Sequence, residues 1–596
     1  MKLQLAPSIQ PETGSNDLET SRYKLTRTRR LARAWASALP EPRRRDLAAL
    51  FTQRAIESYR NHASPSSELS TPFSTPYGEL DLALEQLADA LGQEAAPLPQ
   101  AEALFQLTGL YTTLLASRER SAMGAFYTPP ALVERLLDLA GEHGTDWRTA
   151  TILDPASGGG AFLVAAAVRM RDALANVDPA FVLTQIGTRL RGLELDPYAA
   201  WFGQAAVEIA LADLAARARR AVPIIVRVAD TIEEAPSQTF DLVVGNPPYG
   251  RLKLTSDQRA RFARSLFGHA NLYGVFTDIA VRWAKPDGVI AFLTPTSFLG
   301  GQYFSALRAL LAAEAPPVAI DFVHARSGVF EDVLQETLLA IYRCGHPANR
   351  FQVHYIRLAD DGPPELVRNG TVALPPVSSD PWLAPREPQQ SRLVATAERM
   401  SHRLADWGYR VSTGPLVWNR FKSQLEDKAG RQTRPLIWAE AVTTDGRFVH
   451  RAERRGHSPY FRLERGDAWL IVDQACVLVH RTTAKEQPRR LIAAELSQDF
   501  IDKQGGVVVE NHLNMVWPAT APKVPPAVVA AFLNSAAADQ LFRCINGSVA
   551  VSAFELEALP LPSPAAMKAV ERLVKRGAKR DVIEDAISAL YQPVDE

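Results

Sequence analysis

Cysteine is scarce in this sequence, and the three that occur, Cys344, Cys476 and Cys544, lie far apart. No Cys-X-X-Cys pair and no cysteine–histidine cluster is present, so neither a structural zinc site nor a disulfide framework is expected. No run of about 18 or more apolar residues offers a membrane-spanning helix, and the N-terminus lacks the apolar core of a signal peptide. These absences predict a protein of the reducing cytoplasm that has no metal and no membrane partner.

An excess of charge of one sign is also missing, because 66 Lys and Arg residues balance 66 Asp and Glu residues. This balance argues against a protein that is basic over its whole surface and coats nucleic acid, but it is compatible with a local basic cleft on a protein of zero net charge. The chain of 596 residues is too long for a single core, and its length predicts roughly three or four domains.

The apolar patterns change several times along the chain. Amphipathic helical patterns come first, and then short apolar runs alternate with helical patterns, which predicts an α/β domain with a mostly parallel sheet. A proline-rich connector with a little strand, a region of short strands with one helix over residues 524–545, and a final helical stretch follow. We expect a helical N-terminal extension, an α/β domain, a connector, a mixed α+β domain and a C-terminal helical segment over residues 1–120, 121–345, 346–410, 411–562 and 563–596.

A glycine-rich turn follows the first predicted strand, in ILDPASGGGAFL. Asp154 stands at the strand tip, and Gly158, Gly159 and Gly160 allow a tight turn and a close approach of the backbone to a ligand. The turn lacks the GxGxxG spacing of dinucleotide-binding folds and the GxxxxGK[ST] spacing of P-loops. By itself it is compatible with NAD, with a nucleotide, with S-adenosylmethionine or with an ordinary loop.

Acidic residues also end the next two predicted strands. Glu194 follows the second strand, where an acidic side chain can accept hydrogen bonds from both hydroxyls of a ribose. Asp230 ends the third strand, where a carboxylate can accept a hydrogen bond from the amino group of adenine. Any one such acid could instead cap a helix, and Asp196, just before Pro197, is the best candidate for a cap. Three acids at three successive strand tips, with a glycine turn among them, predict a cofactor that contains a nucleoside.

The fourth predicted strand, FDLVVG, ends abruptly in Asn246, Pro247, Pro248 and Tyr249. The Asn246 side-chain oxygen can accept one hydrogen of an NH2 group, and the prolines hold the backbone extended so that the Pro247 carbonyl can accept the other. Two acceptors on one amine pull its nitrogen from planar towards tetrahedral geometry and free its lone pair for attack. Tyr249 can stack on the flat ring that carries the amine. The tetrapeptide therefore predicts catalysis on a planar NH2 substrate.

In this order the motifs resemble those of the gamma class of N6-adenine DNA methyltransferases, over residues 124–342. The resemblance implies a Rossmann-like, class I S-adenosylmethionine-dependent methyltransferase domain with a mostly parallel seven-stranded sheet. It implies that Thr128 of FYTPP helps to hold the methionine carboxylate of the cofactor, and that NPPY is the catalytic tetrapeptide. The cofactor-binding residues that it implies are Thr128, Asp154, Ala156, Gly158, Gly160, Glu194, Asp230 and Asn246.

The resemblance extends to the binding of a flipped base. Phe330 in GVFEDVLQETLLAIY matches the aromatic residue that would stack on the far face of the base, opposite Tyr249, although an ordinary core phenylalanine is the alternative. Flipping is required because the adenine N6 is paired and stacked in duplex DNA. The C-terminal region resembles the target-recognition domains of this class more loosely. Its basic residues are candidates to read guanine or bind phosphate, if they are not merely solvated: Arg420, Lys422, Arg481 and Arg489.

We therefore expect a site-specific adenine-N6 DNA methyltransferase of a restriction-modification or phage-defence system, with double-stranded DNA as its partner. A cognate restriction endonuclease or defence-system subunits are the further partners expected. NPPY also occurs in enzymes that methylate a glutamine amide in proteins or an amino group in RNA, which are generally much smaller. A modification or specificity subunit of a larger complex is another alternative. A fused restriction enzyme finds no support in residues 1–120, because no convincing nuclease motif occurs there.

Overall fold

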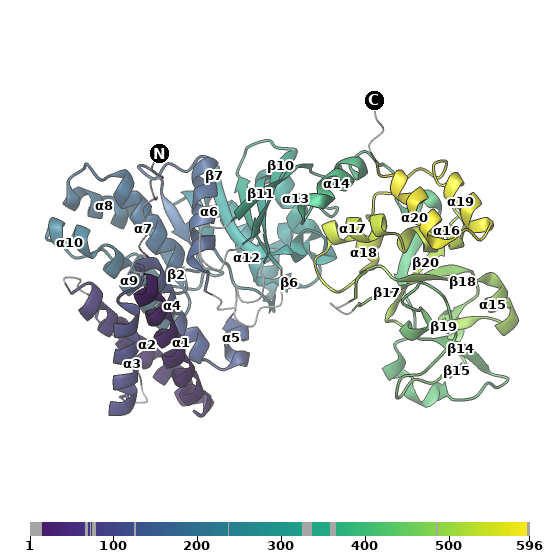
Figure 1. The fold of residues 1–596 in the computed structure, drawn as a ribbon, viewed down its shortest axis with the longest axis horizontal. Helices are drawn as coiled ribbons and strands as arrows, with labels where there is room; N and C mark the ends of the chain where they lie inside the picture. Colours follow the sequence, from purple (N-terminus) through teal and green to yellow (C-terminus); the bar gives the residue numbers. More distant parts are fainter. Residues whose placement is uncertain are drawn as a thin grey trace, which may run out of the picture.

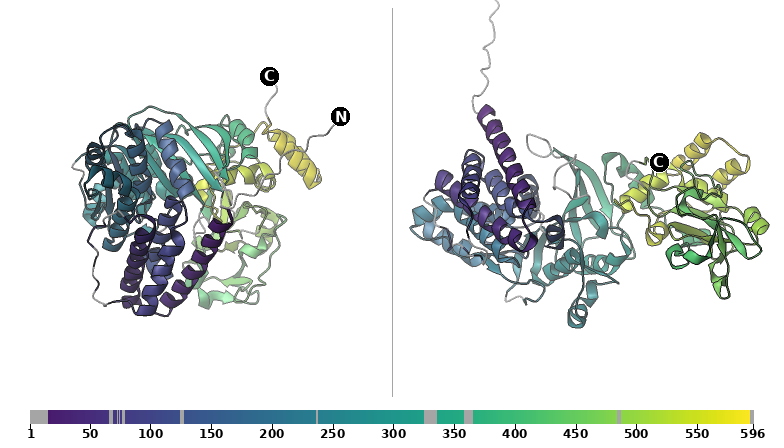
Figure 2. Two further views of the ribbon diagram at one scale, coloured as in Figure 1. Left: turned by 60° about the vertical axis from the view of Figure 1, so that its left-hand side comes forward. Right: turned by 90° about the horizontal axis from the view of Figure 1, so that it is seen from below.

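The computed structural model shows three regions in a row, a bundle of N-terminal helices, a central α/β region and a C-terminal region of smaller sheets and helices (Figure 1). The view from below shows the N-terminal helices and the C-terminal region on opposite sides of the molecule (Figure 2, right). The residues that the structure describes are 15–65, 69–71, 73, 75, 79–123, 127–235, 238–324, 336–357, 365–483 and 487–592.

One nine-stranded mixed sheet organises the central region, in the order β11-β10-β8-β9-β7-β4-β1-β2-β3. The strands β3, β2, β1, β4 and β7 run parallel, whereas β9 is antiparallel to both of its neighbours. The predicted α/β architecture is confirmed, but the sheet has nine strands instead of seven, because β10 and β11 extend it beyond β8. The strands are β1 Ile152–Asp154, β2 Leu190–Glu194, β3 Val226–Val228, β4 Phe240–Gly245, β7 Ala284–Pro295, β8 Pro317–His324, β9 Thr337–Arg343, β10 Arg350–Arg357 and β11 Glu365–Ala373.

Helices cover both faces of this sheet, which explains the long apolar runs of its central strands. Leu242, Val243 and Val244 of β4 are all fully buried, as a strand covered on both faces requires. α7 packs against both α6 and α9. α12 packs against α13 and against the strands β4 and β7. The helices of the region are α6 Pro130–Glu142, α7 Ala161–Ala173, α8 Pro179–Arg189, α9 Pro197–Ala210, α10 Ala212–Ala218, α11 Ser256–Arg261, α12 Leu272–Trp283 and α13 Ser305–Glu314.

The N-terminal helices share a hydrophobic core with the α/β region. Trp201, Phe202 and Ile209 of α9 are buried in one cluster with residues of α2, α3 and α4. α9 is largely apolar and is buried on all sides, and the N-terminal helices cover the side that faces away from the sheet. These helices are α1 Ser15–Ser37, α2 Glu41–Ala63, α3 Leu82–Ala95, α4 Gln100–Leu114 and α5 Ser117–Met123.

The C-terminal region contains a four-stranded sheet, β12-β20-β17-β18, and a five-stranded sheet, β13-β15-β14-β19-β16. The strands are β12 Tyr409–Thr413, β13 Leu425–Glu426, β14 Thr433–Ile437, β15 Tyr460–Arg462, β16 Ile471–Val472, β17 Cys476–His480, β18 Ala493–Leu496, β19 Val507–Val509 and β20 Leu513–Pro518. The helices are α14 Ser391–Ala397, α15 Gln498–Gln504, α16 Pro526–Leu533, α17 Ala536–Ile545, α18 Ala553–Glu557, α19 Lys568–Lys575 and α20 Arg580–Ala589.

One expected helix of this region is divided in two. The apolar run after Pro525 forms α16 and then α17, because Ser535 leaves helical geometry and caps α17 through the backbone amide of Ala538. Among the described residues, no single helix has both the length and the apolar composition to cross a bilayer, although two bent pairs, Pro197–Ala210 with Ala212–Ala218 and Pro526–Leu533 with Ala536–Ile545, meet that test when joined.

Candidate active site

The glycine turn leads from the end of β1 into α7. Gly158 and Gly160 have φ values of 49° and 80°, in the left-handed region that side-chain-bearing residues rarely adopt. A Cβ atom on Gly160 would lie 2.8 Å from the Cα of Gly203 in α9, so this glycine allows the turn to pack against α9. Gly158 instead points its backbone N–H at a carboxylate oxygen of Glu194, at 2.8 Å. This hydrogen bond therefore ties the turn after β1 to the end of β2.

Asp154 and Glu194 lie at the ends of adjacent strands, as predicted for a parallel pair. Asp154 is almost fully buried, and its Oδ1 accepts a 3.1 Å hydrogen bond from the Ala156 amide. Burial raises the pKa of Asp154 to about 8, and the nearby charge of Glu194 adds to the increase. Burial also raises the pKa of Glu194, although backbone amides of Asp196 and Gly158 donate to it. Two carboxyl groups at one end of the sheet thus repel each other when both are charged. A cationic or hydrogen-donating ligand would relieve this repulsion, so such a ligand is favoured here.

Asp230 is placed differently from the other two acids. Its side chain is exposed and accepts a 2.9 Å hydrogen bond from the Ile232 amide, in the turn after β3. Asp196 serves as the predicted helix cap, because its Oδ1 accepts a hydrogen bond from the Tyr198 amide at the start of α9. Among the three acids at strand tips, Asp230 is therefore the one most open to solvent.

The tetrapeptide follows β4 at the same edge of the sheet. The Asn246 side-chain nitrogen donates to Oγ1 of Thr128 at 3.1 Å, which joins the tetrapeptide to the segment that leads into α6. The Tyr249 hydroxyl donates to the Asn246 side-chain oxygen at 2.6 Å and lies 3.4 Å from the Leu293 carbonyl. A carbonyl oxygen has two lone pairs, so the Asn246 oxygen can accept more than one hydrogen bond. Pro247 is buried, and its carbonyl oxygen accepts no hydrogen bond within the described part of the chain.

Only one side of the expected stacking sandwich lies within the described residues. The Tyr249 ring is only 9% exposed and packs edge-on against Tyr273, with ring centroids 6.1 Å apart. Stacking of a base on Tyr249 therefore requires that the ring become more accessible than it is in this conformation. Phe330, the candidate for the opposite face, lies outside the described residues.

A small cavity brings part of the predicted site together. Its volume is about 40 Å³, which is room for about one water molecule. The Tyr127 ring covers the glycine turn, because Cβ atoms on Gly158 and Gly159 would lie 3.1 and 2.7 Å from it, so a ligand on this part of the turn displaces the ring. The cavity is lined by Phe105, Thr108, Tyr127, Thr128, Ala156, Ser157, Gly158, Gly159, Ala161, Phe162 and Asn246.

Several of these lining residues were not predicted. Tyr127 and Ser157 stand next to predicted residues in the motifs FYTPP and DPASGGGAFL, so the motifs themselves could have suggested them. Phe105 and Thr108 come from α4, and no motif singles them out because only the packing of α4 on the turn brings them to the cavity. Three buried side-chain oxygens of this site, in Asp154, Ser157 and Tyr127, have no hydrogen-bond partner among the described residues. Such atoms are rare in folded proteins and indicate that a polar ligand belongs here.

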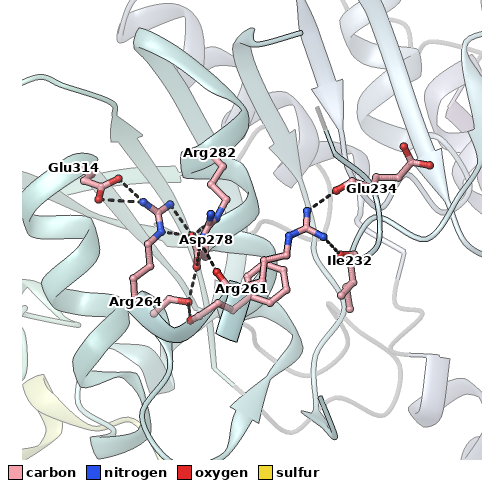
Figure 3. Close-up of polar contacts among 9 residues, drawn as sticks. Ile232, Glu234, Arg261, Arg264, Asp278, Arg282 and Glu314 are labelled. Carbon is pink, nitrogen blue, oxygen red and sulfur yellow. Dashed lines mark hydrogen bonds and ion pairs between the residues drawn. The ribbon is translucent and has the colours of Figure 1, made fainter. Parts of the chain in front are cut away.

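The segment after the tetrapeptide is held by a buried carboxylate (Figure 3). β5 Arg251–Leu252 and β6 Ala270–Asn271 pair to close a loop that contains α11. Asp278 of α12 is fully buried and binds the guanidinium groups of Arg264 and Arg282 at 2.6 and 2.9 Å. Arg261 then donates to the backbone carbonyls of Ile232 and Glu234, beside Asp230 (Figure 3). The loop after the tetrapeptide and the turn after β3 are thus one connected unit.

The four basic candidates of the C-terminal region fall into two kinds. Arg420 and Lys422 are exposed, and the Lys422 ammonium lies 5.6 Å from the ring centre of Trp418. Arg481 donates to the Asn511 carbonyl at 2.7 Å. Arg489 donates to two backbone carbonyls and is half-buried, and burial lowers its pKa. In this conformation Arg420 and Lys422 are the pair whose charges are open to a partner.

Comparisons with known proteins place this geometry among methyltransferases. Residues 220–330, which include the tetrapeptide, match the family described as Eco57I restriction-modification methylase. The type II methyltransferase M.BsuBI of Bacillus subtilis is 25% identical over 334 residues, or 55% of this chain and 66% of that protein. M.PstI of Providencia stuartii is 25% identical over 368 residues, or 59% of this chain and 70% of that protein. The matches thus span about two thirds of the length of these relatives.

Solved structures were also compared with the whole chain. The type IIL restriction-modification enzyme MmeI in complex with DNA superposes with a TM-score of 0.48 at 12% identity, covering 97% of this chain and 94% of that one. The type IIG restriction endonuclease BpuSI gives a TM-score of 0.45, also at 12% identity, over 98% of this chain and 75% of that one. The family match and the curated relatives support a methyltransferase.

Proposed function

We propose that this protein transfers a methyl group from S-adenosylmethionine to the N6 amino group of adenine in duplex DNA, at a specific sequence, within a restriction-modification or phage-defence system. The observation that carries the proposal is the hydrogen bond between Asn246 of the tetrapeptide and Thr128, at a cavity lined by the glycine turn. This bond brings the amine-binding motif and the proposed cofactor motifs to one place.

The residues of the cavity fit the amino-acid end of S-adenosylmethionine. Buried Asp154 offers an unpaired carboxylate oxygen to an ammonium group, and Ser157 and Tyr127 offer unpaired hydroxyls to a carboxylate. Glu194 would bind the ribose hydroxyls, and exposed Asp230 would accept a hydrogen bond from the adenine amine. When bound, the cofactor supplies an electrophilic methyl group.

The chain's own part in the reaction is to prepare the amine. The Asn246 side-chain oxygen and the Pro247 carbonyl accept its two hydrogens, which localises the lone pair on nitrogen for attack. Thr128 holds the Asn246 amide so that its oxygen, and not its nitrogen, faces the amine. Tyr249 shares the same oxygen and limits its movement. Acceptors fixed before the reaction lower its barrier because they do not have to reorganise.

The choice of DNA rests on three features. About 220 residues follow β11, the last strand of the sheet, and their basic side chains include Arg420 and Lys422, which are exposed and able to bind phosphate. The curated relatives are named as type II methyltransferases, and the matching family is a restriction-modification methylase. Gamma-class membership and N6 specificity rest on the motif order and on NPPY.

Single-molecule sequencing of DNA from cells that express the wild type or the Asn246→Ala variant tests the proposal. We expect N6-methyladenine at one sequence motif in the wild type and none in the variant, because the variant lacks the side-chain acceptor. Absence of the mark in both, together with methylation of a protein glutamine or of RNA, would show that the substrate class is wrong.

A further inference from the structure

The N-terminal helices reach the proposed cofactor site, although no motif assigned them a role there. α4 supplies Phe105 and Thr108 to the wall of the cavity. A Cβ atom on Gly159 would lie 2.7 Å from the Cβ of Thr108, so α4 lies directly on the glycine turn. The cavity therefore exists only when α4 is packed against the α/β region.

One turn farther along α4, Tyr111 makes a buried contact with α9. Its hydroxyl donates a 2.6 Å hydrogen bond to Oδ2 of Asp196, and both residues are almost fully buried. Arg45 of α2 completes the group, because it lies 3.3 Å from Oδ1 of Asp196 and donates to the Tyr111 hydroxyl at 3.1 Å. A buried carboxylate needs such partners, since an unpaired charge in this position is costly.

Asp196, which is held in place by Tyr111 and Arg45, in turn positions Glu194. Its backbone N–H donates to Oε1 of Glu194 at 2.9 Å, while the Gly158 N–H donates to Oε2 at 2.8 Å. The two carboxylate oxygens of Glu194 are thus aligned from opposite sides, one by the glycine turn and one by Asp196. A shift of Asp196 would rotate the Glu194 carboxylate relative to the turn.

We propose that the N-terminal helices are part of the cofactor site, with Tyr111 and Arg45 as positioning residues that hold Asp196 and, through its backbone, the Glu194 carboxylate for the ribose hydroxyls. The inference rests on the proposed function, because it takes the ligand of Glu194 to be the cofactor. On this proposal the N-terminal helices do more than cover α9. Their displacement from α9 would weaken cofactor binding, even though they carry none of the predicted cofactor motifs.

Calorimetric titration of the full-length protein with S-adenosylmethionine and S-adenosylhomocysteine tests this inference. We expect Tyr111→Phe to weaken binding about tenfold, as removal of a hydrogen bond to a charged group predicts. Tyr59→Phe is the matched control, because Tyr59 is equally buried in the same helical layer and its hydroxyl bonds to none of the described residues. The control should bind within about twofold of the wild type. Arg45→Gln, at a residue whose side chain is 40% exposed, should weaken binding several-fold and serves if Tyr111→Phe does not fold.

A double-mutant cycle separates positioning from a general loss of stability. If Tyr111 acts through Glu194, Tyr111→Phe should weaken binding about tenfold in the wild-type background and less than twofold in the Glu194→Gln background. Equal losses in the two backgrounds, or an equal loss in Tyr59→Phe, would overturn the inference while cofactor binding by the wild type upholds the proposed function. No binding of either ligand by the wild type would overturn both.

Discussion

The Asn246 side chain is bonded through its nitrogen to Thr128, which lies 118 residues earlier in the chain, at a distance of 3.1 Å. The bond orients the amide, because an amide that donates to Thr128 turns its oxygen the other way, towards the Tyr249 hydroxyl. This contact therefore joins the proposed catalytic oxygen to the proposed cofactor motif. Thr128 is buried, so water does not compete for this bond.

Thr128→Val tests this contact, because it removes the hydroxyl and keeps the shape of the side chain. We expect the turnover number to fall about tenfold and the free energy of unfolding to fall by about 1 kcal/mol. Thr277→Val is the control, since within the described residues that buried hydroxyl bonds to the Tyr273 carbonyl of its own helix and to no other group. Methyl-transfer rates and urea titrations measure both quantities. Equal turnover in the two variants would contradict the orienting role.

The buried carboxyl of Asp154 predicts a dependence of stability on pH. Its pKa is about 8 in the folded chain and about 4 when unfolded, so the folded state binds the extra proton between these values. Its contribution to stability therefore decreases as the pH rises from about 4 to about 8. Asp154→Asn abolishes this titration and should stabilise the protein more at pH 8.5 than at pH 5.5, by up to about 3 kcal/mol.

Urea unfolding at the two pH values, without cofactor, measures this difference. A gain that is the same at both values, or larger at the lower one, would show that Asp154 is charged in the folded chain. The same variant should bind S-adenosylmethionine more weakly, because it no longer offers a negative oxygen to an ammonium group.

Arg264 forms ion pairs with two acidic residues, which should contribute differently to the free energy of unfolding. Asp278 is fully buried, whereas the side chain of Glu314 is 48% exposed. Asp278→Asn removes a fully buried carboxylate that two partly exposed guanidinium groups share, and it should destabilise the protein by about 2 kcal/mol. Glu314→Gln removes only a solvated pair and should cost less than about 1 kcal/mol. Thermal unfolding compares the two, and faster proteolysis within residues 250–270 of the first variant would show that Asp278 holds this loop. Similar losses in both would contradict it.

Binding to DNA should depend on the exposed basic residues and not on the internal one. Arg420→Ala and Lys422→Ala should each reduce the slope of log affinity against log salt by about 1, with little change in stability. Arg489→Ala should mainly destabilise the fold, because that side chain holds two backbone carbonyls. Fluorescence anisotropy with a mixed-sequence duplex at several salt concentrations measures the slopes. Unchanged slopes for Arg420 and Lys422 would place the DNA elsewhere.

The α/β architecture could be predicted because its strands are short apolar runs whose ends carry the polar residues. Alternation of strand and helix patterns implies a parallel sheet, and in such a sheet Asp154, Glu194 and Asn246 must meet at one edge. The extension of the sheet by β10 and β11 could not be predicted, since these strands lie in a proline-rich stretch whose pattern is typical of a connector.

The local contacts of the site were less predictable than its location. The stacking of Tyr249 on a substrate stays a prediction, and its packing against Tyr273 and its bond to Asn246 could not be predicted because they depend on tertiary structure. The contact of Gly160 with a ligand stays a prediction, and the sequence did not indicate that its small size also accommodates the backbone of Gly203 in α9. The wall formed by α4 depends on how one helix packs across the turn, which no spacing in its own sequence encodes.

Methyl transfer in vitro is the most direct test of the central claim. Purified protein is incubated with isotopically labelled S-adenosylmethionine and unmethylated viral DNA of mixed sequence, and the DNA is then digested to nucleosides and analysed by mass spectrometry. The account predicts label in N6-methyl-2′-deoxyadenosine with the wild type and none with Asn246→Ala, although the variant still binds the cofactor. Label in a cytosine, in a protein glutamine or in RNA, or transfer to adenine that survives in Asn246→Ala, would contradict the account.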